Sequence, residues 1–409
     1  MVLSGHLSSP NHHPNHLKRN RIFDDGSNDL LSIPADFPEE LIMDILSRLP
    51  AKSVGKFKCV SKSWLSLIST QGFIKAHLAI ASGRDDYQQH CLIFDVYPQN
   101  FNGRTFLVDN FQAKSPETET KTKTDVPKVS EIDYLVRNKS VWPIGSSNGL
   151  VCMRSNISVL FLCNPTTKEF NRLPKTCMER RDRKLDFGFG YDRLNDDYKI
   201  VALIPTSVDS SIEVKVYSLK KNLWRGVEED RKIRVRVSQF ADYFQNTGGK
   251  LHWRVLIDGV PYLKIASFDL ADETYVEIDC PKNKEGKHPY GLGVLVDDLS
   301  LLYNAGTQTD IWVMLKESWT KVFSISYYLG GITDLAPFCS QVVAPLRNGE
   351  ILCVRDSYLL LYNPKTNASR RFLHIGNFGF GEGMTHGYFL FGNVSLSVES
   401  LLSPNVHDI

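Results

Sequence analysis

The chain has 409 residues, with 48 Lys and Arg side chains against 46 Asp and Glu, a formal net charge of only +2. This balance gives no general attraction to nucleic acid, which usually needs a clustered basic face, so we expect no nucleic-acid partner. Hydrophobic residues make up 42% and aromatic residues 11% of the chain, which is enough for a packed core. The length exceeds one small domain and favours two domains of unequal size.

The cellular compartment is indicated by the cysteines and the N-terminus. The eight cysteines contain no C-x-x-C pair, which indicates free thiols in a reducing compartment. The first residues are polar and lack the apolar stretch of a signal peptide. No apolar run approaches the ~18 residues of a membrane-spanning helix, so we expect no membrane span. The sequence therefore predicts a protein of the cytoplasm and/or the nucleus.

A helical region follows a polar tail. Residues 1–32 are rich in Ser, Asn and His, have little to bury, and are predicted to be a disordered tail. Asp36 is a candidate helix N-cap, with Glu39 closing a capping box and Pro38 tolerated in the first turn. Pro50 is expected to end this helix. The apolar residues between them have the spacing of one helical stripe: Leu41, Ile42, Ile45, Leu46 and Leu49.

Further short helices are expected after Pro50, one capped by Ser53 and one capped by Ser61. Their apolar residues are Val54, Phe57 and Val60 in the first, and Trp64, Leu67 and Ile68 in the second. The same spacing recurs up to Leu78, so residues 33–78 predict a small all-α unit, followed by a linker over 79–90. A unit below ~50 residues struggles to bury its apolar surface alone, so we expect a partner to complete the stripe.

Strands replace helices beyond about residue 90. Short β-rich runs are bounded by turn residues, as in residues 150–153, 159–162, 199–203 and 358–362. Three dipeptides of hairpin type each precede a new run: Asn148-Gly149, Gly248-Gly249 and Asn348-Gly349. The polar stretch 112–131 interrupts the pattern and is expected to be a loop inserted in the first repeat.

The strands recur with a period near fifty residues. A polar turn residue follows an apolar run at Asn164, Ser218, Asp269 and Asn363, and the intervals are 54, 51 and 94 residues. Because the last interval is two steps of 47, a further repeat is predicted near position 316. Such a period in a region of strands alone indicates β-propeller blades of kelch-like size, with room for about six or seven. We assign residues 91–405 to this propeller and expect about six blades.

The sequence offers no candidate catalytic site. No nucleophile, acid–base pair or cluster of metal ligands has a usable spacing, so we expect a non-enzymatic protein without cofactor or metal. The tryptophans of the strand region are expected to pack between blades: Trp142, Trp224, Trp253, Trp312 and Trp319.

Several motifs carry a resemblance to a known family. The segment IPADFPEELIMDILSRLPAKSVGKFKCVSKSWLSLISTQGFIKAHL resembles an F-box, with Leu49-Pro50 and the V-S-K-x-W block from Val60 to Trp64. Downstream, SSNGLVCM, FLCNPTTKEFNRLP, FGFGYDRLNDDYKIV, VYSLKKNLWR, GGKLHW, NGEILCV and LLLYNPKTNASRR resemble the F-box-associated propeller of a large plant family. The resemblance covers residues 33–403. It implies an α+β multidomain chain, with a small all-α F-box of three helices followed by an all-β propeller.

The resemblance also implies partners. In this family the F-box binds a Skp-type adaptor, which links to a cullin, and the propeller holds a protein substrate, here unidentified, for ubiquitination. The adaptor-binding residues so implied are Pro34, Leu41, Ile42, Ile45, Leu46, Leu49, Pro50, Val54, Phe57, Val60 and Trp64. Phe57, Val60 and Trp64 are equally suited to the small domain's own core. The chain is thus expected to be a substrate-recognition subunit of a ubiquitin ligase, or alternatively an F-box scaffold acting outside the ligase.

Overall fold

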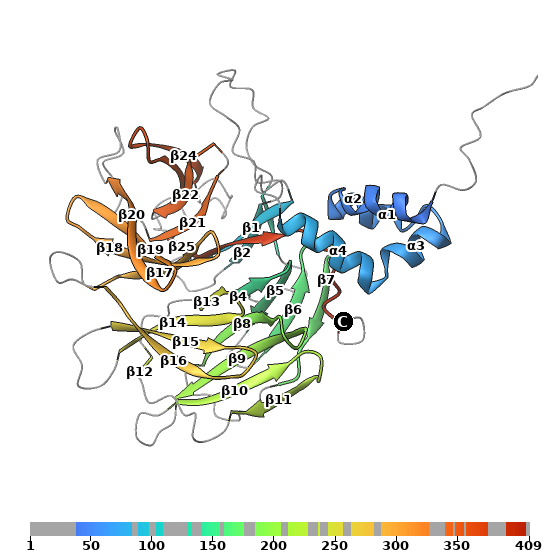
Figure 1. Cartoon of the computed structure of the whole chain (residues 1–409), viewed down its shortest axis with the longest axis horizontal. Helices are drawn as coiled ribbons and strands as arrows, with labels where there is room; N and C mark the ends of the chain where they lie inside the picture. Colours follow the sequence, from blue (N-terminus) through green and yellow to red (C-terminus); the bar gives the residue numbers. More distant parts are fainter. Residues whose placement is uncertain are drawn as a thin grey trace, which may run out of the picture. The chain divides into compact units, whose positions relative to one another are not determined.

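The computed structural model describes residues 38–83, 89–97, 104–108, 129–132, 141–155, 159–175, 185–205, 212–227, 236–237, 244–256, 263–281, 288–326, 340–346, 348–355, 357–374 and 390–405. The chain forms two compact units, Met1–Ile42 and Met43–Ile409. The second unit holds most of the helical residues and all described strands (Figure 1). The predicted tail over 1–32 and the predicted N-cap Asp36 lie outside the described residues.

The helical region contains four described helices. They are α1 (Glu39–Ser47), α2 (Ala51–Phe57), α3 (Lys62–Ile68) and α4 (Gln71–Ser82). The predicted cap of α3 is confirmed, because the Ser61 hydroxyl accepts a hydrogen bond from Trp64 N at 3.1 Å. The predicted cap at Ser53 is wrong. Helix α2 begins directly after Pro50, whose φ of −57° suits a helix start, so Ser53 lies inside the helix.

Helix α4 is the longest described helix, with 12 residues, and Thr70 caps it by accepting a bond from Phe73 N at 3.2 Å. It continues to Ser82, into the segment predicted as a linker, because its apolar spacing continues to the buried Ala81. None of the described helices is long and apolar enough to cross a membrane. The division of the chain into tail, helical unit, linker and propeller at residues 32, 78 and 90 stays a prediction.

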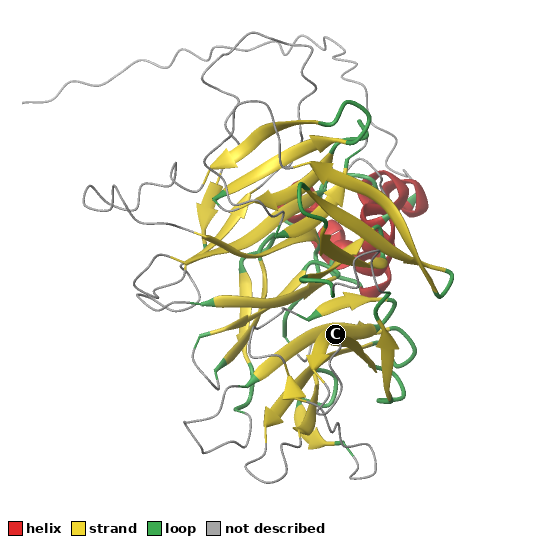
Figure 2. Cartoon of the chain, turned by 90° about the vertical axis from the view of Figure 1, so that its left-hand side faces the viewer, coloured by secondary structure: helices red, strands yellow, loops and turns green. Residues whose placement is uncertain are grey.

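Beyond residue 89 the described chain forms six antiparallel sheets, which we name blades A to F (Figures 1 and 2). Blade A contains β25 (Leu390–Val398), β1 (His90–Tyr97), β2 (Arg104–Val108) and β3 (Val129–Glu131). Blade B contains β4 (Trp142–Ser147), β5 (Leu150–Arg154), β6 (Leu160–Asn164) and β7 (Glu169–Arg172). Blade C contains β8 (Asp186–Asp192), β9 (Asp197–Pro205), β10 (Ile212–Ser218) and β11 (Leu223–Gly226).

The remaining three blades follow in chain order. Blade D contains β12 (Arg236–Val237), β13 (Gln245–Thr247), β14 (Lys250–Leu256), β15 (Leu263–Asp269) and β16 (Tyr275–Asp279). Blade E contains β17 (Gly291–Leu295), β18 (Asp298–Asn304), β19 (Gln308–Leu315) and β20 (Ser318–Ser326). Blade F contains β21 (Gln341–Pro345), β22 (Ile351–Arg355), β23 (Tyr358–Asn363) and β24 (Ala368–His374).

The blades close into a ring through the C-terminal strand. The strands β25, β4, β8, β13, β17 and β21 adjoin one another in that cyclic order, so each is the innermost strand of its blade. Strand β25 pairs with β1 from His90↔Val398 to Tyr97↔Leu390. On its two flanks, Ser146 Oγ donates to Leu396 O at 3.4 Å and Gln341 Nε2 donates to Val394 O at 2.6 Å. Blade A thus joins the two ends of a six-bladed propeller, as expected for this architecture.

The predicted repeat is confirmed, and its turn residues share one role. Each ends the third strand of its blade, and its side-chain oxygen accepts a backbone N–H two or three residues later: Asn164 from Thr166 N (2.8 Å), Ser218 from Lys221 N (3.1 Å), Asp269 from Ala271 N (2.9 Å) and Asn363 from Lys365 N (2.9 Å). The repeat predicted near position 316 is the turn between β19 and β20. A local polar turn therefore sets the visible period.

The predicted hairpins are also confirmed. Asn148 (φ 54°) and Gly149 (φ 82°) join β4 to β5, and Gly248 and Gly249 (φ 61° and 80°) join β13 to β14. The loop prediction over 112–131 is wrong at its end. Residues Val129–Glu131 form β3 and pair with β2, which covers an edge that β2 would otherwise expose, whereas residues 112–128 lie outside the described part.

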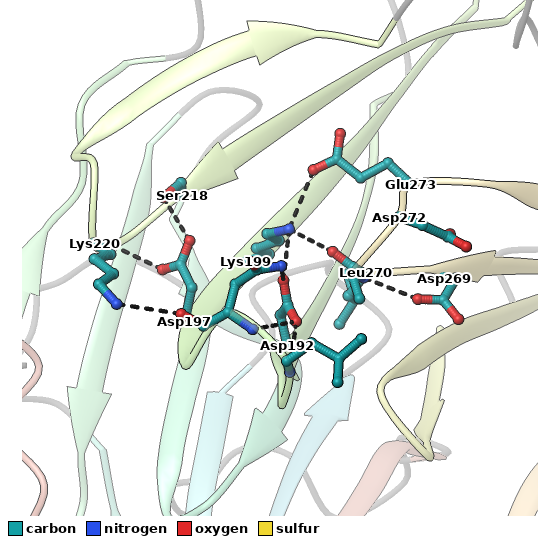
Figure 3. Close-up of polar contacts among 12 residues, drawn as sticks. Asp192, Asp197, Lys199, Ser218, Lys220, Asp269, Leu270, Asp272 and Glu273 are labelled. Atoms are coloured by element: carbon teal, nitrogen blue, oxygen red, sulfur yellow. Dashed lines mark hydrogen bonds and ion pairs between the residues drawn. The ribbon is translucent and has the colours of Figure 1, made fainter.

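Neighbouring blades are joined by buried polar contacts as well as apolar ones. Lys199 of β9 is 6% exposed, and its ammonium lies 2.8 Å from Asp192 Oδ2 and 3.2 Å from Glu273 Oε1 of blade D (Figure 3). It also donates to Leu270 O, while Arg225 of blade C pairs with the same Glu273. Burial raises the pKa of Asp192, but Lys199 and Asn195 outweigh this and leave it below its usual value. Lys199 therefore links blade C to blade D.

The prediction that tryptophans pack between blades is confirmed for Trp224, Trp253, Trp312 and Trp319, whereas the described ring contact of Trp142 is with Arg154 of its own blade. Trp253 is 1% exposed within the core between blades C and D. Trp224 and Trp319, each on the outermost strand of a blade, donate through Nε1 to Pro174 O and Asp279 O of the preceding blade, both at 3.1 Å. The six cysteines in the described part of the chain are free thiols.

Candidate functional site

The outward face of α1 carries uncovered apolar side chains. Leu41 is 49% exposed and Ile45 is 51% exposed, and the two lie one helical turn apart. Leu46, in contrast, is 2% exposed and belongs to the core of the helices. The Arg48 guanidinium lies 2.8 Å from Asp44 Oδ1, and its hydrogen bonds hold the pKa of that carboxyl below its usual value. The exposed part of the stripe is thus bordered by a solvated ion pair.

The loop between α1 and α2 is held by a hydrogen bond from α4. His77 is fully buried, and its Nε2 donates to Leu49 O at 2.8 Å. Leu49 itself is half-buried, and Pro50 at the start of α2 is exposed. Val54, one turn further, is 0% exposed. The Leu-Pro pair therefore lies at the surface while α2 supplies core.

The turn between α2 and α3 presents a second apolar group. Phe57 and Trp64 are half-buried and meet edge to face, with ring centroids 5.8 Å apart and an interplanar angle of 83°. Val60 between them is 61% exposed, and Leu65 of α3 is 47% exposed. An aromatic pair thus supports a turn whose aliphatic side chains face solvent.

Comparison with known proteins gives this surface a context. The F-box domain family matches residues 35–75, and the F-box associated beta propeller domain family matches residues 98–383. The chain belongs to the plant F-box proteins with an F-box-associated propeller. An F-box/kelch-repeat protein of Arabidopsis thaliana is 31% identical over 317 residues, which cover 74% of this chain and 81% of the relative. The F-box protein CPR1 of the same plant is 28% identical over 324 residues, covering 71% and 73%.

The structure distributes the predicted adaptor contacts of the F-box over three environments. Those that face solvent are Leu41, Ile45, Pro50 and Val60. Those that are half-buried are Ile42, Leu49, Phe57 and Trp64. Those that are buried are Leu46 and Val54. Pro34 lies outside the described residues. The assignment of all eleven to adaptor binding stays a prediction, but Leu46 and Val54 are already covered by the chain itself.

Sequence reasoning missed Leu65. The helical stripe was drawn through Trp64, Leu67 and Ile68, and Leu65 falls on the other side of α3, where it is 47% exposed. An apolar residue off the stripe of a short helix was the available signal, because such a residue faces solvent unless a partner covers it.

From α2 to α4 the charged side chains of the helical region are all basic. No Asp or Glu occurs between Leu49 and Gly83, a stretch that contains five lysines. Lys52 pairs with Glu399 at 3.0 Å and Lys75 pairs with Asp196 at 2.5 Å, both partners coming from the strand region. Lys56 and Lys62 are exposed beside Val60 and Leu65. The α2–α3 turn therefore has a basic border, which suits a partner that carries carboxylates, whereas α1 carries the exposed Glu39, Glu40 and Asp44.

The propeller has two ends of different character. Helix α4 leads into the start of β1, at the end where the two-residue hairpins Asn148-Gly149 and Gly248-Gly249 lie. The connections between the second and third strands, and those from one blade to the next, leave from the opposite end because the strands are antiparallel. The blade-to-blade connections leave from that opposite end, whereas the longest connection, between β2 and β3, leaves from the α4 end. The prediction that loops on one propeller face select the target stays a prediction.

Proposed function

We propose that the chain is the substrate-recognition subunit of an SCF-type ubiquitin ligase. The carrying observation is the exposed apolar group of the F-box, in which Ile45 and Val60 are 51% and 61% exposed. Side chains of this kind on a small helical unit mark a surface that a partner covers. The partner in this proposal is a Skp-type adaptor, with a cullin bound through it.

The mechanism is one of proximity. The propeller holds a protein target, and the F-box tethers that target to a ubiquitin-charged enzyme elsewhere on the scaffold, which raises the effective concentration of a target lysine. In this proposal the chain contributes binding and positioning, performs no bond chemistry itself and needs no cofactor. Members of this family are typically proteins that bring a substrate to the ligase rather than enzymes, which supports the proposal.

A direct test uses the outward-facing residues. The double substitution Ile45→Glu and Val60→Glu should abolish co-purification of a Skp-type adaptor, because two charges would then lie in an apolar contact. Leu46 is a poor choice for this test, since its 2% exposure makes a charge there destabilise the helices. The matched control is Leu194→Glu, a change at a residue 86% exposed on a propeller turn, which should leave adaptor binding intact. Undiminished adaptor capture by the double variant would overturn the interface.

An F-box scaffold outside the ligase is the second candidate. The same exposed surface would then bind the adaptor for stability alone, without a cullin. Deleting residues 33–78 separates the two candidates. If the chain is a ligase receptor, its target should have a longer half-life in cells that carry the deletion, because the target is no longer ubiquitinated. An unchanged half-life favours the scaffold.

We further propose that the protein acts in the cytoplasm or the nucleus. The six described cysteines are free thiols, and four of them, Cys91, Cys152, Cys163 and Cys353, are buried. This usage suits a reducing compartment. Fluorescence of a tagged full-length chain tests it, and accumulation in the secretory pathway would contradict it.

A further inference from the structure

The residues after β25 form a segment that the closure of the ring does not require. Strand β25 ends at Val398, and Glu399–Asn405 continue across the end of blade B, where α4 enters the propeller. We name residues 399–405 the C-terminal strap. Glu399, Ser400, Leu401 and Leu402 are all 5% exposed or less, although they belong to no helix or strand. Irregular backbone that is this well covered has partners on both sides.

On the propeller side, the strap is held by Asn164. The amide Nδ2 of this fully buried residue donates to Ser400 O at 3.0 Å and to Leu402 O at 2.8 Å. Asn171 Nδ2 donates to Pro404 O at 3.3 Å, one strand further out. The hairpin between β4 and β5 also lies against the strap, because a Cβ on Gly149 would come within 2.4 Å of Ser400 Oγ. Blade B therefore carries a binding surface for the strap.

On the helical side, the strap contacts α2. Glu399 Oε1 lies 3.0 Å from Lys52 Nζ, and the glutamate side chain is only 3% exposed. A Cβ on Gly55 would lie 4.0 Å from Leu401 Cδ2, so Leu401 of the strap lies against this face of α2. Moving Lys52 away would leave the buried carboxylate of Glu399 without its ammonium partner and would raise the free energy of the folded chain. The contact therefore restricts how α2 can move relative to the strap.

A second copy of the same turn shows that the Asn164 contacts are specific. Asn363 of blade F uses its Oδ1 as Asn164 does, accepting Lys365 N at 2.9 Å and Thr366 N at 3.3 Å. Asn363 is only half-buried, and the strap does not reach blade F in the described residues. The hydrogen bonds that Oδ1 accepts thus belong to the turn in both blades. The two hydrogen bonds from Nδ2 to carbonyls of the strap, in contrast, are made by Asn164 and not by Asn363 in the described structure.

We infer that the C-terminal strap locks helices α2–α4 onto the propeller, with Asn164 and Glu399 as the positioning residues. The lock fixes how far an adaptor bound to the helices lies from a target bound to the propeller, so the reach to target lysines is constant. This consequence for ubiquitination rests on the proposed function. The lock itself does not, because it is a property of the isolated chain.

The test measures the distance between helices and propeller in the full-length chain. Spin labels are placed on the native, exposed Cys59 after α2 and on a cysteine introduced by Val296→Cys, at a turn residue 65% exposed in blade E. Cys177→Ser, Cys280→Ser and Cys339→Ser leave no other thiol to label outside the four buried ones. Pulsed electron spin resonance then gives the distance distribution. One narrow distribution is expected for the parent chain, and a broad one there would overturn the proposal.

Three variants sharpen the test. Asn164→Asp keeps the turn acceptor but replaces the Nδ2 donor by an oxygen that faces two carbonyls, so the distribution should become about twofold broader. Asn363→Asp makes the same change without a strap and should leave the distribution unchanged. A chain ending at Val398 keeps all of β25 and should be broadest. If the chain that ends at Val398 does not fold, the comparison of Asn164→Asp with Asn363→Asp tests the proposal.

An Asn164→Asp distribution as narrow as that of Asn363→Asp, in a folded propeller, would refute the lock. Adaptor capture by the same chains before labelling separates this result from the proposed function, because the label on Cys59 would lie next to Val60 of the proposed interface. If no variant binds a Skp-type adaptor, the receptor proposal fails while the distance result stands. If all variants bind adaptor equally but only the strap variants broaden, the strap acts on geometry rather than on adaptor affinity.

Discussion

The large apolar side chains of the helices and of the propeller differ in how far they are exposed. In the propeller, Trp253, Phe268 and Leu301 are each 1% exposed or less, because every blade is covered by its two neighbours. In the helical region, Leu41, Ile45, Val60 and Leu65 are 47–61% exposed within 25 residues of chain. The propeller also has exposed apolar residues, such as Leu194 and Val296, but these lie on separate turns. The helical unit, in contrast, is too small to cover its own stripe. The difference marks the helices as the region where exposed apolar side chains are concentrated.

The largest expected effect comes from opening the propeller core. Trp253→Ala should lower the free energy of unfolding by ~3–5 kcal/mol, because it removes an indole that contacts blades C and D and leaves a cavity. Denaturant unfolding monitored by circular dichroism measures this. Trp253→Phe is the control and should cost much less, since Nε1 of Trp253 makes no hydrogen bond in the described structure. Equal losses in both variants would show that the site is not close-packed.

The buried ion pairs between blades come next. Lys199→Met should destabilise the propeller by about 3 kcal/mol, because Asp192 then keeps a buried charge with no ammonium beside it. Lys250→Met is the control, as its pair with Asp269 involves a side chain 47% exposed and should contribute below about 1 kcal/mol. The same unfolding assay checks both. A loss at Lys199 no larger than at Lys250 would mean that the link between blades C and D contributes little.

The same link gives a smaller, pH-dependent effect. The pKa of Asp192 is lowered in the folded chain, so its contribution is full above the unfolded value of about 3.9 and is lost as the pH falls through the lower folded value. The free energy of unfolding should therefore decline below about pH 4, and less steeply in Asp192→Asn. Unfolding curves between pH 7 and pH 3 measure this slope. Parallel slopes for the two proteins would contradict it.

The features of the fold that could be predicted from the sequence are those formed by residues close together in the chain. The propeller was predictable because Asn164, Ser218, Asp269 and Asn363 each form the same polar turn with their own neighbours. The cap at Ser61 is local in the same way, and it was also correct. Ser53 failed because a proline three residues earlier offers a better helix start.

Long-range features were not predictable. Nothing near Lys199 in the chain indicates that its partner is Glu273, 74 residues away, and nothing near Glu399 indicates Lys52. Spacing placed Leu41, Ile45 and Leu46 on one stripe, but only the fold shows that Leu46 turns inward while the other two remain exposed. Helical periodicity identifies the apolar stripe, and tertiary packing decides which part of it remains for a partner.

The smallest expected effect on stability is at the exposed stripe itself. Ile45→Ser should change the free energy of unfolding of the isolated chain by less than about 0.5 kcal/mol, because a side chain 51% exposed loses little burial. With a Skp-type adaptor present, the same substitution should weaken binding at least about tenfold, since a well-buried apolar contact contributes more than 1 kcal/mol. Differential scanning fluorimetry and surface plasmon resonance give the two readings on one sample. Ile45→Val, which keeps a branched apolar group, should retain most of the affinity. A substitution that instead destabilised the isolated chain and spared binding would place Ile45 in the core and remove the contrast between the helices and the propeller.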